Sequence, residues 1–142
     1  MEPVHKAALK GDEQEVVRLV REDGRRLNAQ VQGRNAKVGQ WFVEGCTPLV
    51  LAAWKGHDAL VARLLGMGAD PPLLTCGGWE AAQWACRGNG ASSLALVLDA
   101  GNSFNARDEQ NGTPLMTAAI YDATACAKLL IDRCGSALDL DA

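Results

Sequence analysis

Residues 45–70 read GCTPLVLAAWKGHDALVARLLGMGAD, and this stretch decides the fold. Thr47 can cap a helix with its hydroxyl, and Pro48 suits the first helical position because the N–H that it lacks would be unpaired there. The small pair Ala52-Ala53 allows a second helix to approach closely, and Gly56 can take the left-handed conformation that ends a helix. The stretch therefore predicts a helical hairpin.

The same pattern recurs along the chain with a period of 33 residues. The segments that begin at Pro48, Ala81 and Pro114 share small residues four and five places on, and aliphatic residues sixteen and seventeen places on. A first unit begins at Pro3, and the distance of 45 residues from there to Pro48 is one period plus 12 extra residues, which fall within 33–45. A single hairpin cannot bury its apolar face, so such units stack into one continuous core.

We therefore predict one all-α domain over residues 1–142, built from four stacked helix-turn-helix units with hairpin-like turns. The approximate limits are 1–32 for the first unit, 33–44 for an insertion, and 45–77, 78–110 and 111–142 for the other three units. The turn after each first helix should contain a left-handed residue. Gly11 and Gly56 meet this need, Asn89 is a tolerable substitute, and Asp122 is a poorer one.

The two ends of the array differ in character. Lys6 and Glu15 stand where most of the later units have less polar residues, and a polar outer face suits an N-terminal cap. Residues 138–142 resemble the stretch 104–108, which opens a unit. Because a true end should carry a polar capping face, we expect the array to continue past residue 142.

These units resemble the ankyrin-repeat family, whose repeat has a turn, two helices and a T-P-L-H-x-A signature at a period of 33 residues. Residues 45–70 match most completely, and the resemblance covers the chain apart from the insertion. The histidine of the signature is kept only at His5, and the third unit has Glu80 and Ala81 in place of threonine and proline. The resemblance implies an ankyrin-repeat solenoid that binds another macromolecule.

Composition and charge limit the class of function. The chain has 14 lysine and arginine residues against 17 aspartate and glutamate residues, a formal net charge of −3, which does not indicate a nucleic-acid partner. No apolar run reaches the roughly 18 residues of a membrane span, and residues 1–20 lack the apolar core of a secretory signal. We expect an intracellular protein, cytoplasmic or nuclear, that is not inserted in a membrane and is monomeric when no partner is present.

The chemistry of an enzyme is not evident in the sequence. No nucleophile with an adjacent base and no phosphate-binding glycine motif occurs, and His5 and His57 both occupy positions of the repeat where histidine bonds neighbouring backbone. The five cysteines are odd in number and form no CxxC pair, so we expect buried free thiols rather than disulfides or a zinc site. We therefore predict no catalytic residue, no metal and no cofactor. The cysteines are Cys46, Cys76, Cys86, Cys126 and Cys134.

The family resemblance also implies where a partner would bind. In ankyrin proteins, contacts lie at the hairpin tips before each first helix and on the concave face of that helix. The tip positions are Phe42, Glu44, Cys46, Trp79, Glu109, Gln110 and Gly112. The concave positions are Leu9, Lys10, Trp54, Lys55, Arg87, Gly88, Ile120 and Tyr121. Aromatic residues and arginine dominate binding hot spots, so the predicted binding residues are Lys10, Phe42, Trp54, Lys55, Trp79, Arg87, Ile120 and Tyr121.

The tryptophans allow two interpretations, because large apolar groups are usually buried. Trp84 aligns with an inward position and should pack within the stack, whereas Trp54 aligns with an exposed column and should contact the partner. Trp79 fits either role. Trp41 and Phe42 in the insertion either pin the long loop to the body or offer it to a partner.

Lys10, Lys55 and Arg87 form a basic line that would suit an acidic segment of a protein partner, unless these side chains are simply solvated. The leading interpretation is a protein-interaction module that uses its concave groove and hairpin tips. The alternative is a structural spacer or regulatory segment of a longer ankyrin array within a larger multidomain protein.

Overall fold

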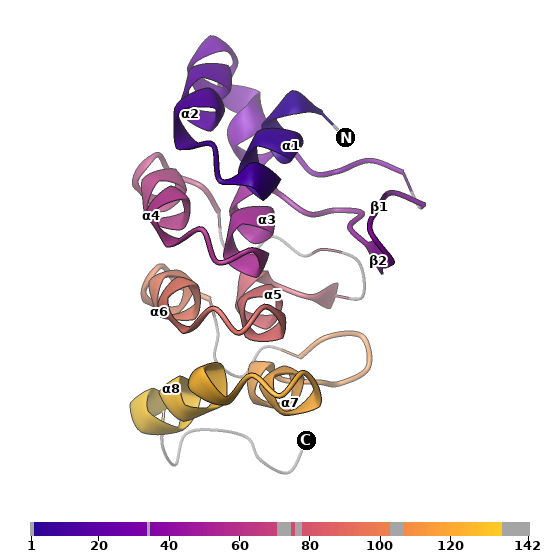
Figure 1. Cartoon of the computed structure of the whole chain (residues 1–142), viewed down its shortest axis with the longest axis vertical. Helices are drawn as coiled ribbons and strands as arrows, with labels where there is room; N and C mark the ends of the chain where they lie inside the picture. Colours follow the sequence, from indigo (N-terminus) through magenta and orange to yellow (C-terminus); the bar gives the residue numbers. More distant parts are fainter. Residues whose placement is uncertain (1, 34, 71–74, 76–77, 103–106, 135–142) are drawn as a thin grey trace.

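The computed structural model describes residues 2–33, 35–70, 75, 78–102 and 107–134. Within these residues the helices form four pairs that stack one on the next, as Figure 1 shows, and the predicted all-α solenoid is confirmed. The pairs are α1 (Pro3–Lys10) with α2 (Glu13–Glu22), α3 (Pro48–Trp54) with α4 (Asp58–Gly66), α5 (Ala81–Arg87) with α6 (Ala91–Asp99), and α7 (Pro114–Ile120) with α8 (Thr124–Cys134). A 3₁₀ helix, η1 (Gly24–Asn28), follows α2. Each predicted unit contains one pair, and the exact limits of the units stay a prediction.

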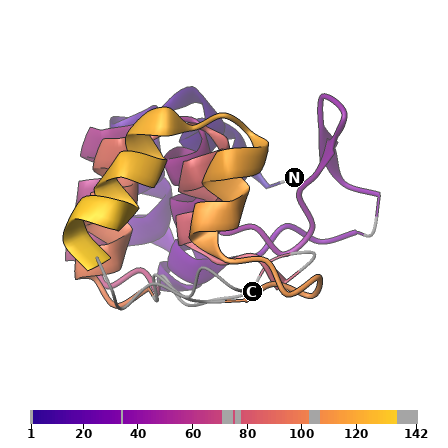
Figure 2. The ribbon, with the colours of Figure 1, turned by 90° about the horizontal axis from the view of Figure 1, so that it is seen from below.

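The helices lie in two layers. The first helices of the pairs, α1, α3, α5 and α7, contact one another in sequence, and the second helices α2, α4, α6 and α8 form the other layer. The insertion hairpin at residues 37–42 and the loop at residues 107–113 extend beyond the layer of first helices, which Figure 2 shows from one end of the stack. The core runs continuously between the layers, as expected for units that bury their apolar faces against their neighbours. Its largest fully buried aliphatic side chains are Leu49, Leu51, Leu60, Leu64, Leu94 and Leu130.

The helix caps explain how each first helix begins. The hydroxyls of Thr47 and Thr113 accept hydrogen bonds from the backbone N–H three residues on, at 3.3 and 3.4 Å, as predicted. The third unit lacks this threonine. There, the backbone N–H of Glu80 donates to Oε1 of Gln83 at 2.8 Å, and the side chain of Asn102 accepts from an N–H in the first turn of α5 at 3.0 Å. In the third unit, the side chains of Gln83 and Asn102 therefore bond N–H groups at the start of α5 in place of the missing threonine.

The turns between paired helices also follow the sequence prediction. Gly11 and Gly56 both have φ of 73°, and Asn89 and Asp122 take the same left-handed conformation with φ of 56° and 55°. Asparagine and aspartate tolerate this conformation better than other residues with a side chain. The left-handed residue predicted for each of the four turns is therefore present.

The two histidines have the structural roles that the sequence predicts. Nε2 of His5 donates to the carbonyl oxygen of Ala29 at 2.7 Å, and Nε2 of His57 lies 2.9 Å from the carbonyl oxygen of Leu9. Each bond joins its histidine to a loop or helix far away in the sequence. The histidines therefore tie neighbouring segments of the stack together.

The buried imidazole of His5 should make folding depend on pH. Burial lowers the pKa of His5, and its Nδ1 is buried with no hydrogen-bond partner among the described residues. The unfolded chain takes up this proton near pH 6.5, whereas the folded chain takes it up only at a lower pH, so stability present above pH 6.5 is lost as the pH falls. One proton contributes a slope of at most about 1.4 kcal/mol per pH unit. Urea unfolding between pH 7.5 and 5 should show this decline in wild type and in His57→Gln.

The matched variant His5→Gln lacks the titrating group and should show a shallower decline over the same range. An identical slope in His5→Gln and wild type would mean that His5 does not control the acid sensitivity of the stack.

The insertion forms a small antiparallel hairpin that the sequence analysis did not predict. Strand β1 (Lys37–Val38) pairs with β2 (Trp41–Phe42), with Lys37 opposite Phe42 and Val38 opposite Trp41. Gly39, with φ of 62°, lies in the turn. Val43 follows β2 and is fully buried in the core, so the insertion is anchored at its base. The hairpin extends from the same side of the stack as residues 107–113, which precede α7 (Figure 1).

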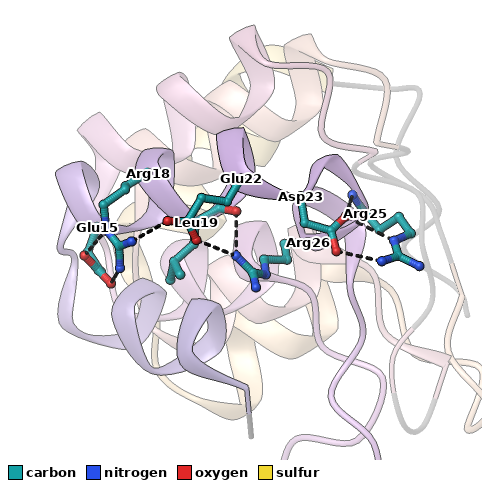
Figure 3. Close-up of polar contacts among 7 residues, drawn as sticks. All are labelled: Glu15, Arg18, Leu19, Glu22, Asp23, Arg25 and Arg26. Atoms are coloured by element: carbon teal, nitrogen blue, oxygen red, sulfur yellow. Dashed lines mark hydrogen bonds and ion pairs between the residues drawn. The ribbon is translucent and has the colours of Figure 1, made fainter.

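The outer surface of the first unit is strongly charged. Figure 3 shows Arg18 between Glu15 and Glu22. Nη1 of Arg18 lies 2.6 Å from Oε1 of Glu22. Nη1 of Arg26 lies 3.2 Å from Glu22 and also donates to the carbonyl oxygen of Leu19 at 3.0 Å. Such exposed pairs contribute little to stability, but they keep this face polar.

Three of the cysteines are free and buried, which confirms the expected packing role for Cys46, Cys86 and Cys126. A hydrogen bond with the Cys126 thiol, together with burial, raises the pKa of Cys86 above its ordinary range. The Cys86 thiol is therefore protonated and unreactive at neutral pH. Cys76 lies outside the described residues, as does the expected continuation at residues 138–142.

Candidate functional site

A groove of about 910 Å³ lies between the insertion hairpin, the loops before α5 and α7, and the exposed sides of these two helices. Its walls come from residues of all these segments, so it crosses the third and fourth units. The lining residues are Asn35, Trp41, Phe42, Glu44, Trp79, Trp84, Arg87, Asp108, Glu109, Gln110, Gly112, Met116, Thr117, Ile120 and Tyr121. The site therefore combines the predicted hairpin tips with the predicted concave face.

Five aromatic side chains form a connected cluster at the groove. Trp84 is buried and meets Trp54 and Trp79 edge to face, with ring centroids 5.2 and 5.3 Å apart. Tyr121 meets Trp41 and Trp79 edge to face, each with a centroid distance of 6.2 Å. Edge-to-face contacts are a favoured geometry for aromatic pairs. The aromatic cluster therefore joins the insertion to the second, third and fourth units.

The guanidinium of Arg87, at the end of α5, lies within the aromatic cluster. Its Cζ is 3.3 Å from the ring centroid of Trp41, 4.9 Å from that of Trp54 and 5.4 Å from that of Tyr121. Burial lowers the pKa of Arg87, but an arginine side chain still carries its charge at neutral pH. These cation–π contacts pin Trp41, and with it the hairpin, to the body of the stack. Phe42 beside it is 48% exposed.

The loop before α7 is organised by Asp108. Trp79 Nε1–H donates to Oδ2 of Asp108 at 2.8 Å, while Oδ1 accepts the backbone N–H groups of Gln110 and Gly112 at 2.9 and 2.8 Å. The side chain of Trp79 is half-buried and forms part of the groove wall. The hydrogen bond to Asp108 therefore fixes the loops before α5 and α7 relative to one another.

The expectation that Trp54 is exposed is wrong, whereas the packing predicted for Trp84 is confirmed. Trp54 is only 8% exposed, because Trp84 packs against it and Nζ of Lys55 lies 4.1 Å from its ring centroid. Cys46, expected at a hairpin tip, is instead fully buried, since it precedes the first turn of α3 among core residues.

Of the eight predicted binding residues, the groove brings together Phe42, Trp79, Arg87, Ile120 and Tyr121. Lys10, Trp54 and Lys55 do not line it, although Lys10 and Lys55 are exposed. The prediction missed Asn35, Asp108, Met116 and Thr117. Met116 and Thr117 lie one helical turn before Ile120, so helical spacing alone would have placed them on the same face.

Among the described residues, no three histidine, cysteine, aspartate or glutamate side chains are placed to hold a metal ion. None of the helices that the structure describes has the length and apolar character needed to cross a bilayer. A second hollow, of about 670 Å³, lies on the outer face between α2 and α4 and is lined mainly by charged side chains, among them Arg18, Arg21 and Arg63.

Comparison with known proteins supports one family. Over 91 residues, or 63% of the chain, the sequence is 34% identical to Tyrosine-protein kinase HTK16 of Hydra vulgaris. Over 149 aligned positions, covering 98% of the chain, it is 29% identical to Ankyrin repeat and SOCS box protein 16 of Homo sapiens. The chain spans 12% and 32% of the lengths of these two relatives. Residues 49–141 match the family model for ankyrin repeats in three copies, and the chain therefore belongs to the ankyrin-repeat family.

Proposed function

We propose that this chain is a protein-interaction module that binds a protein partner in the groove and at the adjoining hairpin tips. Ankyrin repeats are generally protein-interaction modules without catalytic activity. The observation that carries the proposal is the clustering of exposed apolar side chains at one groove: Phe42 is 48% exposed, Ile120 75% and Tyr121 37%. Exposed apolar groups gathered in this way are typical of an interaction site.

The groove is also well ordered for binding. Arg87 and Asp108 hold Trp41 and Trp79 in place through cation–π contacts and a hydrogen bond, so a partner would not have to order these side chains. A surface that is already ordered loses less entropy on association. In this proposal Trp54 does not touch the partner but packs against Trp84, which lines the groove. Lys10 and Lys55 lie outside the groove and would contact a partner only if it extends that far. An intracellular location and the absence of a cofactor belong to the same proposal.

The test compares the loss of exposed apolar side chains in the groove with the loss of an exposed apolar side chain outside it. The variant Phe42→Ala/Ile120→Ala removes exposed groove contacts, whereas Ile131→Ala removes an isoleucine of α8 that is 53% exposed and lies outside the groove. A partner captured from lysate by the wild type should bind the groove variant at least about tenfold more weakly, because a few apolar anchors carry most of the energy of an interface. Ile131→Ala should bind it normally.

Both variants should unfold at the same urea concentration as the wild type within error, because the replaced side chains are exposed. Unchanged affinity of the Phe42→Ala/Ile120→Ala variant would exclude this groove as the binding surface.

The alternative is a structural spacer or regulatory segment of a longer ankyrin array. The small share of each relative that the chain spans, 12% and 32%, supports this candidate. The sequence of the full-length transcript distinguishes the two: a spacer requires further domains in the same polypeptide, whose activity should change when the chain is deleted.

A further inference from the structure

The groove carries an excess of negative charge. Glu44 follows the insertion hairpin, and Asp108 and Glu109 lie in the loop before α7, so its three carboxylates come from both sides of the groove. Arg87 is the cation that lines it. The groove therefore holds three carboxylates and one guanidinium, so negative groups outnumber positive ones in its lining.

The carboxylates are not neutralised by the chain itself. Among the residues that the structure describes, Glu44 and Glu109 form no ion pair, and the groups that bond Asp108 are the uncharged N–H donors of Trp79, Gln110 and Gly112. Arg87 is directed to the aromatic cluster, 3.3 Å from the centroid of Trp41. A bound partner would therefore meet at least two carboxylates, Glu44 and Glu109, that form no ion pair with a described residue.

The basic residues that suggested an acidic partner lie elsewhere. Lys10 and Lys55 are exposed but do not line the groove, and Nζ of Lys55 faces the ring of Trp54 at 4.1 Å. A carboxylate brought into the groove would approach Glu44, Asp108 and Glu109, and like charges at an interface are unfavourable. The charges of the groove thus favour a cation.

The aromatic rings beside the carboxylates complement a cation as well. The stacking of Arg87 on Trp41 shows that these rings accept a guanidinium. Ile120, which also lines the groove, offers an exposed aliphatic surface for a neighbouring side chain. We propose that the groove binds a protein segment in which an arginine or lysine, directed at Glu44 and Glu109, adjoins an apolar residue. This inference rests on the protein-binding function proposed above.

The test is a selection of displayed random dodecapeptides on the wild-type chain, followed by affinity measurement with the synthetic consensus peptide. We expect the selected peptides to be enriched in arginine or lysine beside an aliphatic or aromatic residue. The variant Glu44→Gln/Glu109→Gln, which keeps side-chain size and removes two charges, should bind the consensus about tenfold more weakly. The matched control Asp70→Asn/Asp132→Asn removes two exposed carboxylates outside the groove and should bind like the wild type.

The outcomes distinguish the claim that the partner is cationic from the claim that the groove is the binding site. Acidic or uncharged consensus peptides that still lose affinity in Phe42→Ala/Ile120→Ala would overturn the cationic partner and leave the groove as the binding site. Equal affinity in Glu44→Gln/Glu109→Gln and wild type would also overturn it. If no peptide is selected, or if the consensus binds Phe42→Ala/Ile120→Ala normally, then the proposed groove function fails together with this inference.

Discussion

Replacing Gly88 with alanine should destabilise the stack by about 3 kcal/mol, a large loss for one added methyl group. A Cβ at this position would lie 2.0 Å from the backbone oxygen of Trp54 and 3.1 Å from its carbonyl carbon. The obstructing atoms belong to backbone and not to a flexible side chain, so α5 would have to move away from α3. Urea unfolding followed by far-ultraviolet circular dichroism measures this loss.

Gly66 provides the matched control. It lies at the end of α4, and a Cβ there would meet no atom within 4 Å. Gly66→Ala should therefore leave stability unchanged or raise it by up to about 1 kcal/mol, since alanine restricts the unfolded chain more than glycine does. A Gly88→Ala variant as stable as Gly66→Ala would show that α3 and α5 do not approach as closely as described.

Replacing Trp84 with alanine should cost about 3–5 kcal/mol, the range observed when a large buried aromatic is truncated. Trp84 is only 3% exposed, and its rings contact those of Trp54 and Trp79. Its Nε1–H also donates to Oγ1 of Thr75 at 2.7 Å. The variant would leave a cavity between the second and third units and would remove this hydrogen bond.

Two further variants identify the source of the Trp84 effect. Trp84→Phe keeps an aromatic ring but loses the hydrogen bond to Thr75, so its loss of stability should be intermediate. Trp41→Ala removes a half-buried ring and should cost less than Trp84→Ala. Similar losses for Trp84→Ala and Trp41→Ala in urea unfolding would contradict the view that Trp84 is the buried centre of the cluster.

The fold could be predicted from the sequence because residues that favour the same local structure recur at equivalent positions of the repeat. Thr47 and Thr113 recur at the helix starts, and a residue that tolerates positive φ follows each first helix, even where it is Asn89 or Asp122. These are local effects, because each residue either caps a backbone N–H three positions away or adopts the positive φ that its own position requires. Periodicity then aligns the units, so the stacking follows from the pattern.

The hairpin of the insertion could not be predicted in the same way. Its strands are two residues long, Lys37–Val38 and Trp41–Phe42, which is too short for an alternation of polar and apolar residues to be recognised. The insertion also occurs once, so no second copy reveals which of its residues are structural. The buried contacts of Val43 and the contact of Trp41 with Arg87 show where the insertion joins the body.

The composition of the groove could be predicted better than its geometry. Alignment of the repeats placed Trp54 in an exposed column because the equivalent positions are Arg87 and Ile120, but it could not show that Trp84 and Lys55 would cover the ring. Likewise, the positive charge of Arg87 was evident, whereas its direction toward Trp41 depends on a side chain 46 positions away in the sequence. Contacts between units and across the insertion therefore determine which side chains a partner can reach.

Hydrogen exchange with and without a bound partner tests the central claim most directly, because it reports which backbone segments become protected on binding. With the partner or consensus peptide present, we predict slower exchange in residues 41–44 and 107–121, which form the hairpin edge, the loop before α7 and the exposed side of α7. Exchange in residues 13–22, on the outer face at α2, should not change. Protection confined to 13–22 and the neighbouring part of α4, with none in 107–121, would contradict the assignment of the groove.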